Sequence, residues 1–148
     1  MLFYHGTAAH KDVERAARQS GLYQDLDSLS DGYKTIVGER GNHLSGGQKQ
    51  RVCIARALIR DPSLIIMDDA LSAVDTQTEQ TILAGMDEFF ENRTAVLIAH
   101  RLSTVQNADL ILYMEDGRVH EAGTHEQLLK RGGAYATLYH QQTQGGEA

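Results

Sequence analysis

The sequence predicts an α/β fold in which a helix connects two parallel strands. Residues 64–67 and 95–99 are continuous apolar runs, and such runs are typical of parallel strands that helices cover on both faces. Between the two runs, apolar side chains recur at spacings of one, three or four positions, as on one side of a helix: Ile82, Leu83, Met86, Phe89 and Phe90. A strand, a helix and a second strand in this order form a βαβ unit.

Composition sets wide limits on the class of protein. The 148 residues are 41% hydrophobic and 23% charged, which suits one folded domain and excludes a disordered or collagen-like chain. The net charge of −6 argues against nucleic acid as a partner, because binding a phosphate backbone needs clustered positive charge. The one cysteine, Cys53, forbids an internal disulfide and suits a reducing compartment. No apolar run approaches the roughly 18 residues that cross a bilayer, and the first residues do not resemble a secretory signal.

Caps and turns predict the remaining elements. A helix over residues 10–20 is stopped by Gly21, and a second helix starts at Ser45 and ends before Asp61-Pro62, because a residue that precedes proline avoids the helical region. Residues 22–43 are turn-rich. Thr76 and Glu79 fit a capping box at the start of the helix between the apolar strands. After the second strand we expect a helix at 102–106, strands at 110–114 and 118–122 around an Asp-Gly turn, a helix capped by Thr124 and Gln127, and a last helix at 134–142.

Leu44, Ser45, Gly46, Gly47 and Gln48 form the most informative motif. Two glycines in the first turn of a helix cost about 1 kcal/mol each relative to alanine, so they indicate that a bulky ligand approaches the backbone. Unpaired amides and the positive end of the helix dipole lie at such a start, and with the Ser45 hydroxyl they would form a phosphate cradle. A capping box between Ser45 and Gln48 is the alternative that needs no ligand, although it leaves the glycine pair unexplained.

Acidic residues and a histidine follow the two apolar strands. Asp68 and Asp69 come directly after the first strand, and His100 closes the second. Because ligands in open α/β sheets bind beyond the carboxyl ends of the strands, one carboxylate could hold Mg²⁺ and the other could orient or deprotonate a water molecule. His100 could donate a hydrogen bond to a phosphate oxygen or to that water. A solvated strand end and a structural histidine are the alternatives.

The other histidines and the cysteine are expected to have no chemical role. The histidines show no metal-ligand spacing with cysteine or paired acids, so we expect no zinc site and place six of them at the surface: His5, His10, His43, His120, His125 and His140. Cys53 is expected to be a small packed side chain inside the helix after Ser45, and not a nucleophile.

These motifs together resemble the nucleotide-binding domain of ABC transporters, over nearly the whole chain and in the family's order. Residues 44–48 match the family's signature, residues 64–68 resemble the Walker B strand, and residues 72–75 resemble the D-loop. His100 resembles the switch histidine. Residues 37–41 resemble the X-loop of exporters, which in the family faces the transmembrane domains.

The resemblance implies cofactors and roles for individual residues. ATP and Mg²⁺ are the cofactors of the family. The metal would be held by Asp68, and Asp69 and His100 would act in catalysis. The nucleotide would be contacted by Asp75 and by the signature residues 44–48.

The sequence departs from the family in lacking a Walker A motif, since no G-x-x-x-x-G-K-[ST] occurs in it. The family's A-loop and Q-loop also have no visible counterpart. We therefore expect the carboxyl-terminal part of a nucleotide-binding domain, with a helical signature subdomain over residues 1–61 and the distal half of the ATPase core over residues 62–148. The fold class is then a partial P-loop NTPase core with parallel strands plus a helical subdomain.

A second departure lies at the catalytic base, where the family has glutamate and this chain has Asp69. A side chain one methylene shorter moves the carboxylate by roughly 1 Å, and a misplacement of that order can cost about a hundredfold in rate. Residues 68–75 resemble one half of the heterodimeric bacterial exporters, in which one ATP site is weakened. In the family ATP lies between the Walker motifs of one subunit and the signature of the other, so residues 45–48 would complete the competent site of the partner.

Three interpretations of the chain remain open. In the first it is part of an ABC-type ATPase, paired with a second nucleotide-binding domain and with transmembrane domains at the cytoplasmic face of a membrane, and inactive alone because Walker A is missing. In the second it is a non-enzymatic interaction module that supplies its signature helix to another ABC subunit. In the third it is a fragment that folds poorly and self-associates through an unpaired apolar edge strand.

Overall fold

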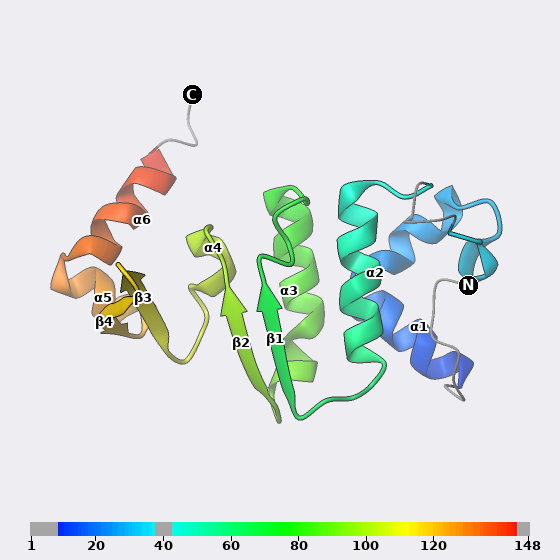
Figure 1. Cartoon of the computed structure of the whole chain (residues 1–148), viewed down its shortest axis with the longest axis horizontal. Helices are drawn as coiled ribbons and strands as arrows, with labels where there is room; N and C mark the ends of the chain where they lie inside the picture. The colour runs from blue at the N-terminus through cyan, green and yellow to red at the C-terminus, as the bar shows by residue number, and fades with distance from the viewer. Residues whose placement is uncertain (1–8, 38–42, 145–148) are drawn as a thin grey trace. The chain divides into compact units, whose positions relative to one another are not determined.

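The computed structural model describes residues 9–37 and 43–144, which form two compact units that divide between Ile98 and Ala99. The first unit contains helices and a pair of parallel strands, and the second contains a hairpin and further helices (Figure 1). Each unit has its own hydrophobic core. The combination of helices with a parallel strand pair confirms the predicted α/β class. His5 and residues 38–41 of the predicted X-loop lie outside the described residues.

The amino-terminal half of the first unit is helical. α1 (His10–Gln19) ends where predicted, and Gly21 then takes the left-handed conformation at φ 71°. The turn-rich stretch that follows contains two 3₁₀ helices, η1 (Leu22–Ser28) and η2 (Gly32–Lys34). α2 (Gly46–Leu58) begins directly after Ser45, as the sequence predicts.

A parallel βαβ unit follows α2 and confirms the central prediction. β1 (Leu64–Asp68), α3 (Thr76–Phe90) and β2 (Thr94–Ile98) occur in the expected order, and the strands pair from Leu64 opposite Thr94 to Asp68 opposite Ile98. The carboxyl ends of both strands and the amino ends of α2 and α3 lie at the same end of this unit (Figure 1). The predicted site residues of the first unit are therefore gathered at one end.

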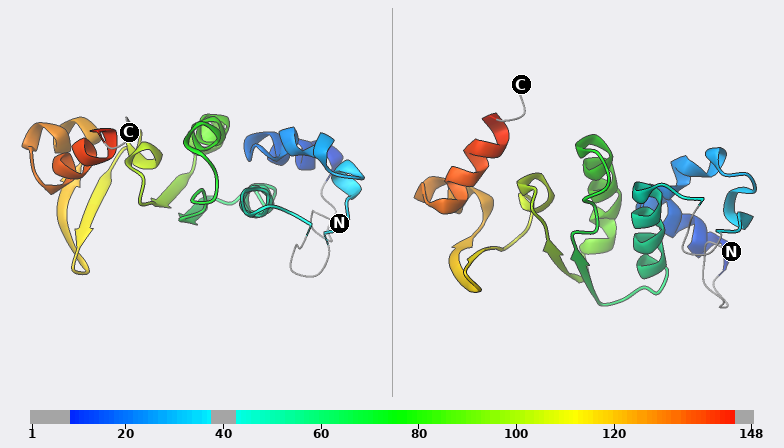
Figure 2. Two further views of the ribbon diagram at one scale, coloured as in Figure 1. Left: turned by 90° about the horizontal axis from the view of Figure 1, so that it is seen from above. Right: turned by 45° about the horizontal axis from the view of Figure 1, so that its top comes forward.

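Only one face of this sheet is covered by the described residues of the first unit. Ile65 and Met67 are buried in a core with side chains of α1, α2 and α3, whereas Ile66 on the other face is 62% exposed. Figure 2 shows α3 over one face of the two strands. The prediction that both faces are covered is therefore wrong for the described residues of this unit, because its helices all contribute to the same core. The exposed apolar side chains of the open face are Leu64, Ile66, Val96 and Ile98.

Two local predictions in the first unit are also wrong. Thr76 and Glu79 do not cap α3, because Asp75 is the N-cap residue and its carboxylate accepts the Thr78 amide, while Glu79 is buried. Cys53 is exposed and not packed, because the residues on either side of it supply the core-facing side of α2.

The second unit is a β-hairpin followed by two helices. α4 (Leu102–Val105) precedes β3 (Ile111–Glu115) and β4 (Arg118–Gly123), and then come α5 (His125–Arg131) and α6 (Ala134–Gln144). These elements and the capping box of α5 match the prediction to within two residues. Asp116 and Gly117 have φ of 49° and 72°, as a two-residue hairpin turn requires.

His125 is a packing residue and not the surface residue that the sequence predicts. It is half-buried, and its Nδ1 lies 2.8 Å from the hydroxyl oxygen of Tyr135, which is fully buried. Burial raises the pKa of the Tyr135 hydroxyl. The His125 ring also meets the Tyr139 ring edge-on, with 5.0 Å between ring centroids. His125 therefore joins α5 to α6.

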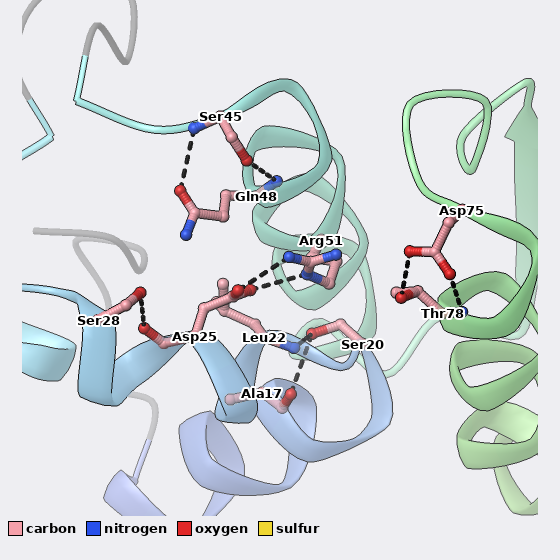
Figure 3. Close-up of polar contacts among 10 residues, drawn as sticks. All are labelled: Ala17, Ser20, Leu22, Asp25, Ser28, Ser45, Gln48, Arg51, Asp75 and Thr78. Carbon is pink, nitrogen blue, oxygen red and sulfur yellow. Dashed lines mark hydrogen bonds and ion pairs between the residues drawn. The ribbon is translucent and has the colours of Figure 1, made fainter.

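A partly buried ion pair joins α2 to η1. Arg51 Nε donates to Asp25 Oδ2 at 2.8 Å and Arg51 Nη2 donates to Asp25 Oδ1 at 2.9 Å (Figure 3). The two side chains are only 13% and 17% exposed. A bidentate ion pair of this kind is directional as well as stabilising. It holds α2 against η1 at Arg51, one turn after the glycine pair.

We predict that Asp25→Asn lowers the free energy of unfolding by about 1.5–3 kcal/mol, because Arg51 would keep its charge in a shielded place with a weaker acceptor. Urea unfolding followed by circular dichroism measures the change. Glu14→Gln is the matched control, since it removes a surface pair with Arg18 of the same 2.8 Å length, and it should move the midpoint little. Equal shifts for the two variants would contradict the structural role of Asp25.

Candidate functional site

The first turn of α2 carries the Leu-Ser-Gly-Gly-Gln motif. Ser45 is the N-cap residue: its Oγ accepts the Gln48 amide at 3.2 Å, and Gln48 Oε1 accepts the Ser45 amide at 3.0 Å (Figure 3). The capping box that needs no ligand is therefore present. It leaves the amides of Gly46 and Gly47 without a partner inside the helix, because the first amides of an α-helix have none. Leu44, which precedes the box, is buried.

The two glycines have different structural reasons. A Cβ on Gly47 would lie 3.2 Å from the Ala73 carbonyl oxygen and 3.2 Å from Val74 Cγ1, so the loop after β1 packs directly against this position. A Cβ on Gly46 would make an ordinary contact with Ala73 Cβ at 3.5 Å. Packing within the chain thus accounts for Gly47 and does not account for Gly46.

The two predicted acids lie at the carboxyl end of β1, and both are exposed. Asp68 is the last residue of β1, and Asp69 has a left-handed φ of 50°, a conformation that aspartate tolerates better than most residues. The Asp69 amide donates to the Ile98 carbonyl oxygen at the end of β2, at 2.8 Å. Both carboxylates are therefore accessible at the end of the sheet where α2 and α3 begin.

Gln50 belongs to this site, and no role was assigned to it from the sequence beyond continuing the signature. Its Oε1 accepts the Ala73 amide at 2.9 Å, and its Nε2 donates to Ser72 Oγ at 3.0 Å. Its spacing was the available signal. Gln50 follows Gly46 by four positions and Gly47 by three, so it lies on the same side of the helix as the two glycines. Its side chain brings the first turn of α2 and the loop after β1 together.

Asp75 ends that loop and caps α3. Its Oδ1 accepts the Thr78 amide at 2.9 Å, and its Oδ2 accepts the Thr78 hydroxyl at 2.6 Å (Figure 3). Hydrogen bonds from the Thr78 hydroxyl and amide lower the pKa of the Asp75 carboxyl. The carboxylate therefore has a structural role in the chain, and each of its oxygens can accept one further hydrogen bond.

His100 lies in the second unit, where α6 holds its backbone. Its carbonyl oxygen accepts Gln142 Nε2 at 2.8 Å, and Gln142 Oε1 accepts the Leu102 amide at 3.0 Å. The histidine itself is exposed. The residue that positions it, Gln142, lies more than forty positions away in the sequence, and sequence analysis did not single it out.

Comparison with known proteins points to one family. A sequence model of the ABC transporter family matches residues 2–72. The heavy metal tolerance protein of Schizosaccharomyces pombe is 49% identical over 140 residues, which are 94% of this chain and 17% of that protein. The mitochondrial potassium channel ATP-binding subunit of Homo sapiens is 51% identical over 135 residues, 91% of this chain and 18% of that protein. This chain belongs to the ABC transporter family.

A solved structure shows that the fold is that of the family. The bacterial Atm1-family ABC exporter with ATP bound superposes with a TM-score of 0.83 at 45% identity, over 92% of this chain and 24% of the exporter chain. The predicted partial ABC ATPase fold is thereby confirmed. This ABC transporter chain spans less than a quarter of the length of each of these three relatives.

Two further properties of this ABC transporter chain concern membranes and metals. Within residues 9–37 and 43–144, no helix is long and apolar enough to cross a membrane. In the same part of the chain, no three His, Cys, Asp or Glu side chains gather into a group that could hold a metal ion.

We predict opposite effects on stability for alanine at the two glycines of the ABC signature. Gly46→Ala should raise the free energy of unfolding by about 0.5 kcal/mol, since alanine restricts the unfolded chain and has room in the folded one. Gly47→Ala should lower it by about 1 kcal/mol, because the new methyl group would press on Ala73 and Val74. Urea unfolding of both variants measures the two changes. A stabilising Gly47→Ala would contradict the packing described above.

Proposed function

We propose that this chain lends the first turn of α2 to ATP held by a second nucleotide-binding domain, within an ATPase that powers export across a membrane. The observation that carries the proposal is Gly46, whose amide has no partner in the helix and whose missing side chain is not explained by packing. The positive end of the helix dipole adds to the attraction for a phosphate. The relative solved with ATP bound supports this choice of nucleotide.

The four residues of the turn would have different parts in the phosphate cradle. The amides of Gly46 and Gly47 would donate to oxygens of the terminal phosphate. The Ser45 hydroxyl only accepts in the capping box, so its hydrogen is available to donate as well. The Gln48 side chain is engaged with the Ser45 backbone, so it would hold Ser45 in place. The buried Leu44 would anchor the turn to the core.

The carboxylates of the chain would belong to a second composite site. Asp68 would hold Mg²⁺, and the bound ion would neutralise charge that develops on the phosphates. Asp69 would orient or deprotonate the attacking water, and His100 would donate a hydrogen bond to a phosphate oxygen. Asp75 would accept a hydrogen bond at the nucleotide interface through its remaining lone pairs. Because Asp69 is one methylene shorter than glutamate, this second site would be the slower one of a heterodimer.

The proposed assembly divides the work between chains. Residues 1–61 would form the signature subdomain and residues 62–148 the distal half of the ATPase core. A second nucleotide-binding domain would supply the phosphate-binding loop of the site that residues 45–48 complete, and transmembrane domains would supply the transport path, with the assembly at the cytoplasmic face of a membrane. Without that loop and its lysine, which the sequence lacks, the β- and γ-phosphates lose their main ligands. We therefore expect the chain alone to show no turnover and to bind ATP no more tightly than about millimolar.

The missing Walker A motif also favours a second candidate function. The chain would then be a non-enzymatic module that lends its signature helix to another ABC subunit and makes no use of Asp68 and Asp69. The two candidates agree on the cradle formed by residues 45–48. They differ in whether the carboxylates of this chain contribute to hydrolysis.

The test uses a partner nucleotide-binding domain that has Walker A and Walker B but whose own signature glycines are replaced, so that it needs a donated signature. We predict that the wild-type chain raises its single-turnover rate of ATP hydrolysis at least tenfold, and that Gly46→Ala removes this gain, since its methyl group blocks approach of the phosphate. Cys53→Ser is the matched control, because Cys53 is exposed on the same helix. It should act as the wild type does.

The other outcomes of this experiment are equally informative. No rise in rate and no co-elution on mixing would contradict donation of the signature. Hydrolysis by the purified chain alone that Asp68→Asn abolishes would contradict the expected inactivity. Asp68→Asn in this chain should leave the stimulation of the partner unchanged under either candidate, because Asp68 would belong to the second site and not to the site that the donated signature completes.

A further inference from the structure

We propose that Gln50 is a positioning residue that holds the first turn of α2 and the loop after β1 at a fixed separation, and thereby keeps the phosphate donors aligned during hydrolysis. The inference deepens the proposed function and rests on it. The Gln50 side-chain amide has hydrogen-bond partners at both its oxygen and its nitrogen. Gln50 Oε1 accepts the Ala73 amide at 2.9 Å, while Gln50 Nε2 lies 3.0 Å from Ser72 Oγ and 3.5 Å from the Asp69 carbonyl oxygen.

The direction of each hydrogen bond in this group is determined. The Ala73 amide can only donate, so the oxygen end of Gln50 must face it. The Ser72 hydroxyl donates to the Asp69 carbonyl oxygen at 3.0 Å, so it is left to accept from Gln50 Nε2. A residue with a donor and an acceptor on one rigid amide therefore suits this place. A glutamate of the same length would keep the bond from Ala73 and lose the bond to Ser72.

The same loop is also held against α2 by a contact that does not involve Gln50. A Cβ on Gly47 would lie only 3.2 Å from the Ala73 carbonyl oxygen and from Val74 Cγ1. The loop is thus fixed at two points, one beside the glycine pair and one a turn further along the helix. Two contacts fix both the tilt of the first turn of α2 relative to the loop and its distance from the loop. The direction in which the amides of that turn point depends on the tilt.

The contact joins groups that serve different ATP sites in the proposed assembly. The amides of Gly46 and Gly47 would face the nucleotide of the partner, while Asp69 would face the nucleotide of the other site. Gln50 connects them inside one chain through the Asp69 carbonyl oxygen and the Ala73 amide. Gln50 would not touch the nucleotide, because both ends of its amide are already used. Its loss should therefore slow the chemical step and leave ATP binding nearly unchanged.

The experiment compares Gln50→Met and Gln50→Glu with the wild type in the complex with the signature-deficient partner domain. For Gln50→Met we expect the single-turnover rate to fall about tenfold, with the half-saturating ATP concentration within twofold of the wild type. For Gln50→Glu we expect a smaller loss, because it keeps the bond from Ala73. Cys53→Ser again serves as the control on the same helix. Amide hydrogen exchange of the chain alone should show Ala73 exchanging about tenfold faster in Gln50→Met and at the wild-type rate in Gln50→Glu.

The two readouts separate failure of this proposal from failure of the proposed function. If the Gln50→Met chain stimulates the partner to the same rate of hydrolysis as the wild-type chain does, the positioning role is overturned. A rise in the half-saturating ATP concentration that matches the loss of rate would overturn it too, since Gln50 would then act in binding. If the wild-type chain does not stimulate the partner at all, the proposed function is contradicted, and so is the effect of Gln50 on the rate of hydrolysis. Exchange at Ala73 would then show whether Gln50 still holds the loop.

Discussion

The packing of the first turn of α2 against the loop after β1 determines what this chain can present to a ligand. Gly47 meets the Ala73 carbonyl oxygen and Val74 so closely that a methyl group would have to displace them. Gln50 fastens the same loop one turn further along. The loop starts after Asp68, the last residue of β1, and ends at Asp75, which caps α3. One contact region therefore places the amides, the acids and the start of α3 at one end of the unit.

Within that region the polar groups divide into those used by the fold and those left for a ligand. Ser45 and Gln48 satisfy each other through the capping box, so the helix is complete without a ligand. The amides of Gly46 and Gly47 are left over, and the Ser45 hydroxyl keeps a hydrogen to donate. A cradle that is already folded loses little conformational entropy when a phosphate arrives. This division makes a nucleotide held by another polypeptide a suitable ligand for the turn.

Sequence reasoning succeeded where the determinants are local and failed where they lie far along the chain. Ser45, the Asp116-Gly117 turn and the cap of α5 act within four residues, and all were placed correctly. The exposure of Cys53 and of the outer sheet face depends on which elements pack where, which no local pattern states. Likewise Gln50 and Gln142 act on residues about twenty and forty positions away. For the same reason the sequence did not reveal that Gly47 packs against Ala73 and Val74, which lie in a loop beyond the motif.

The most direct test of the account follows the two glycine amides themselves. The chain is labelled with ¹⁵N-glycine and mixed with the signature-deficient partner domain, Mg²⁺ and a non-hydrolysable ATP analogue, and the amide resonances of Gly46 and Gly47 are recorded. The account predicts large downfield shifts and slowed exchange of these two amides only when the partner and the nucleotide are both present, because hydrogen bonds to phosphate oxygens form then. Unchanged resonances in a complex that demonstrably contains the nucleotide would contradict it.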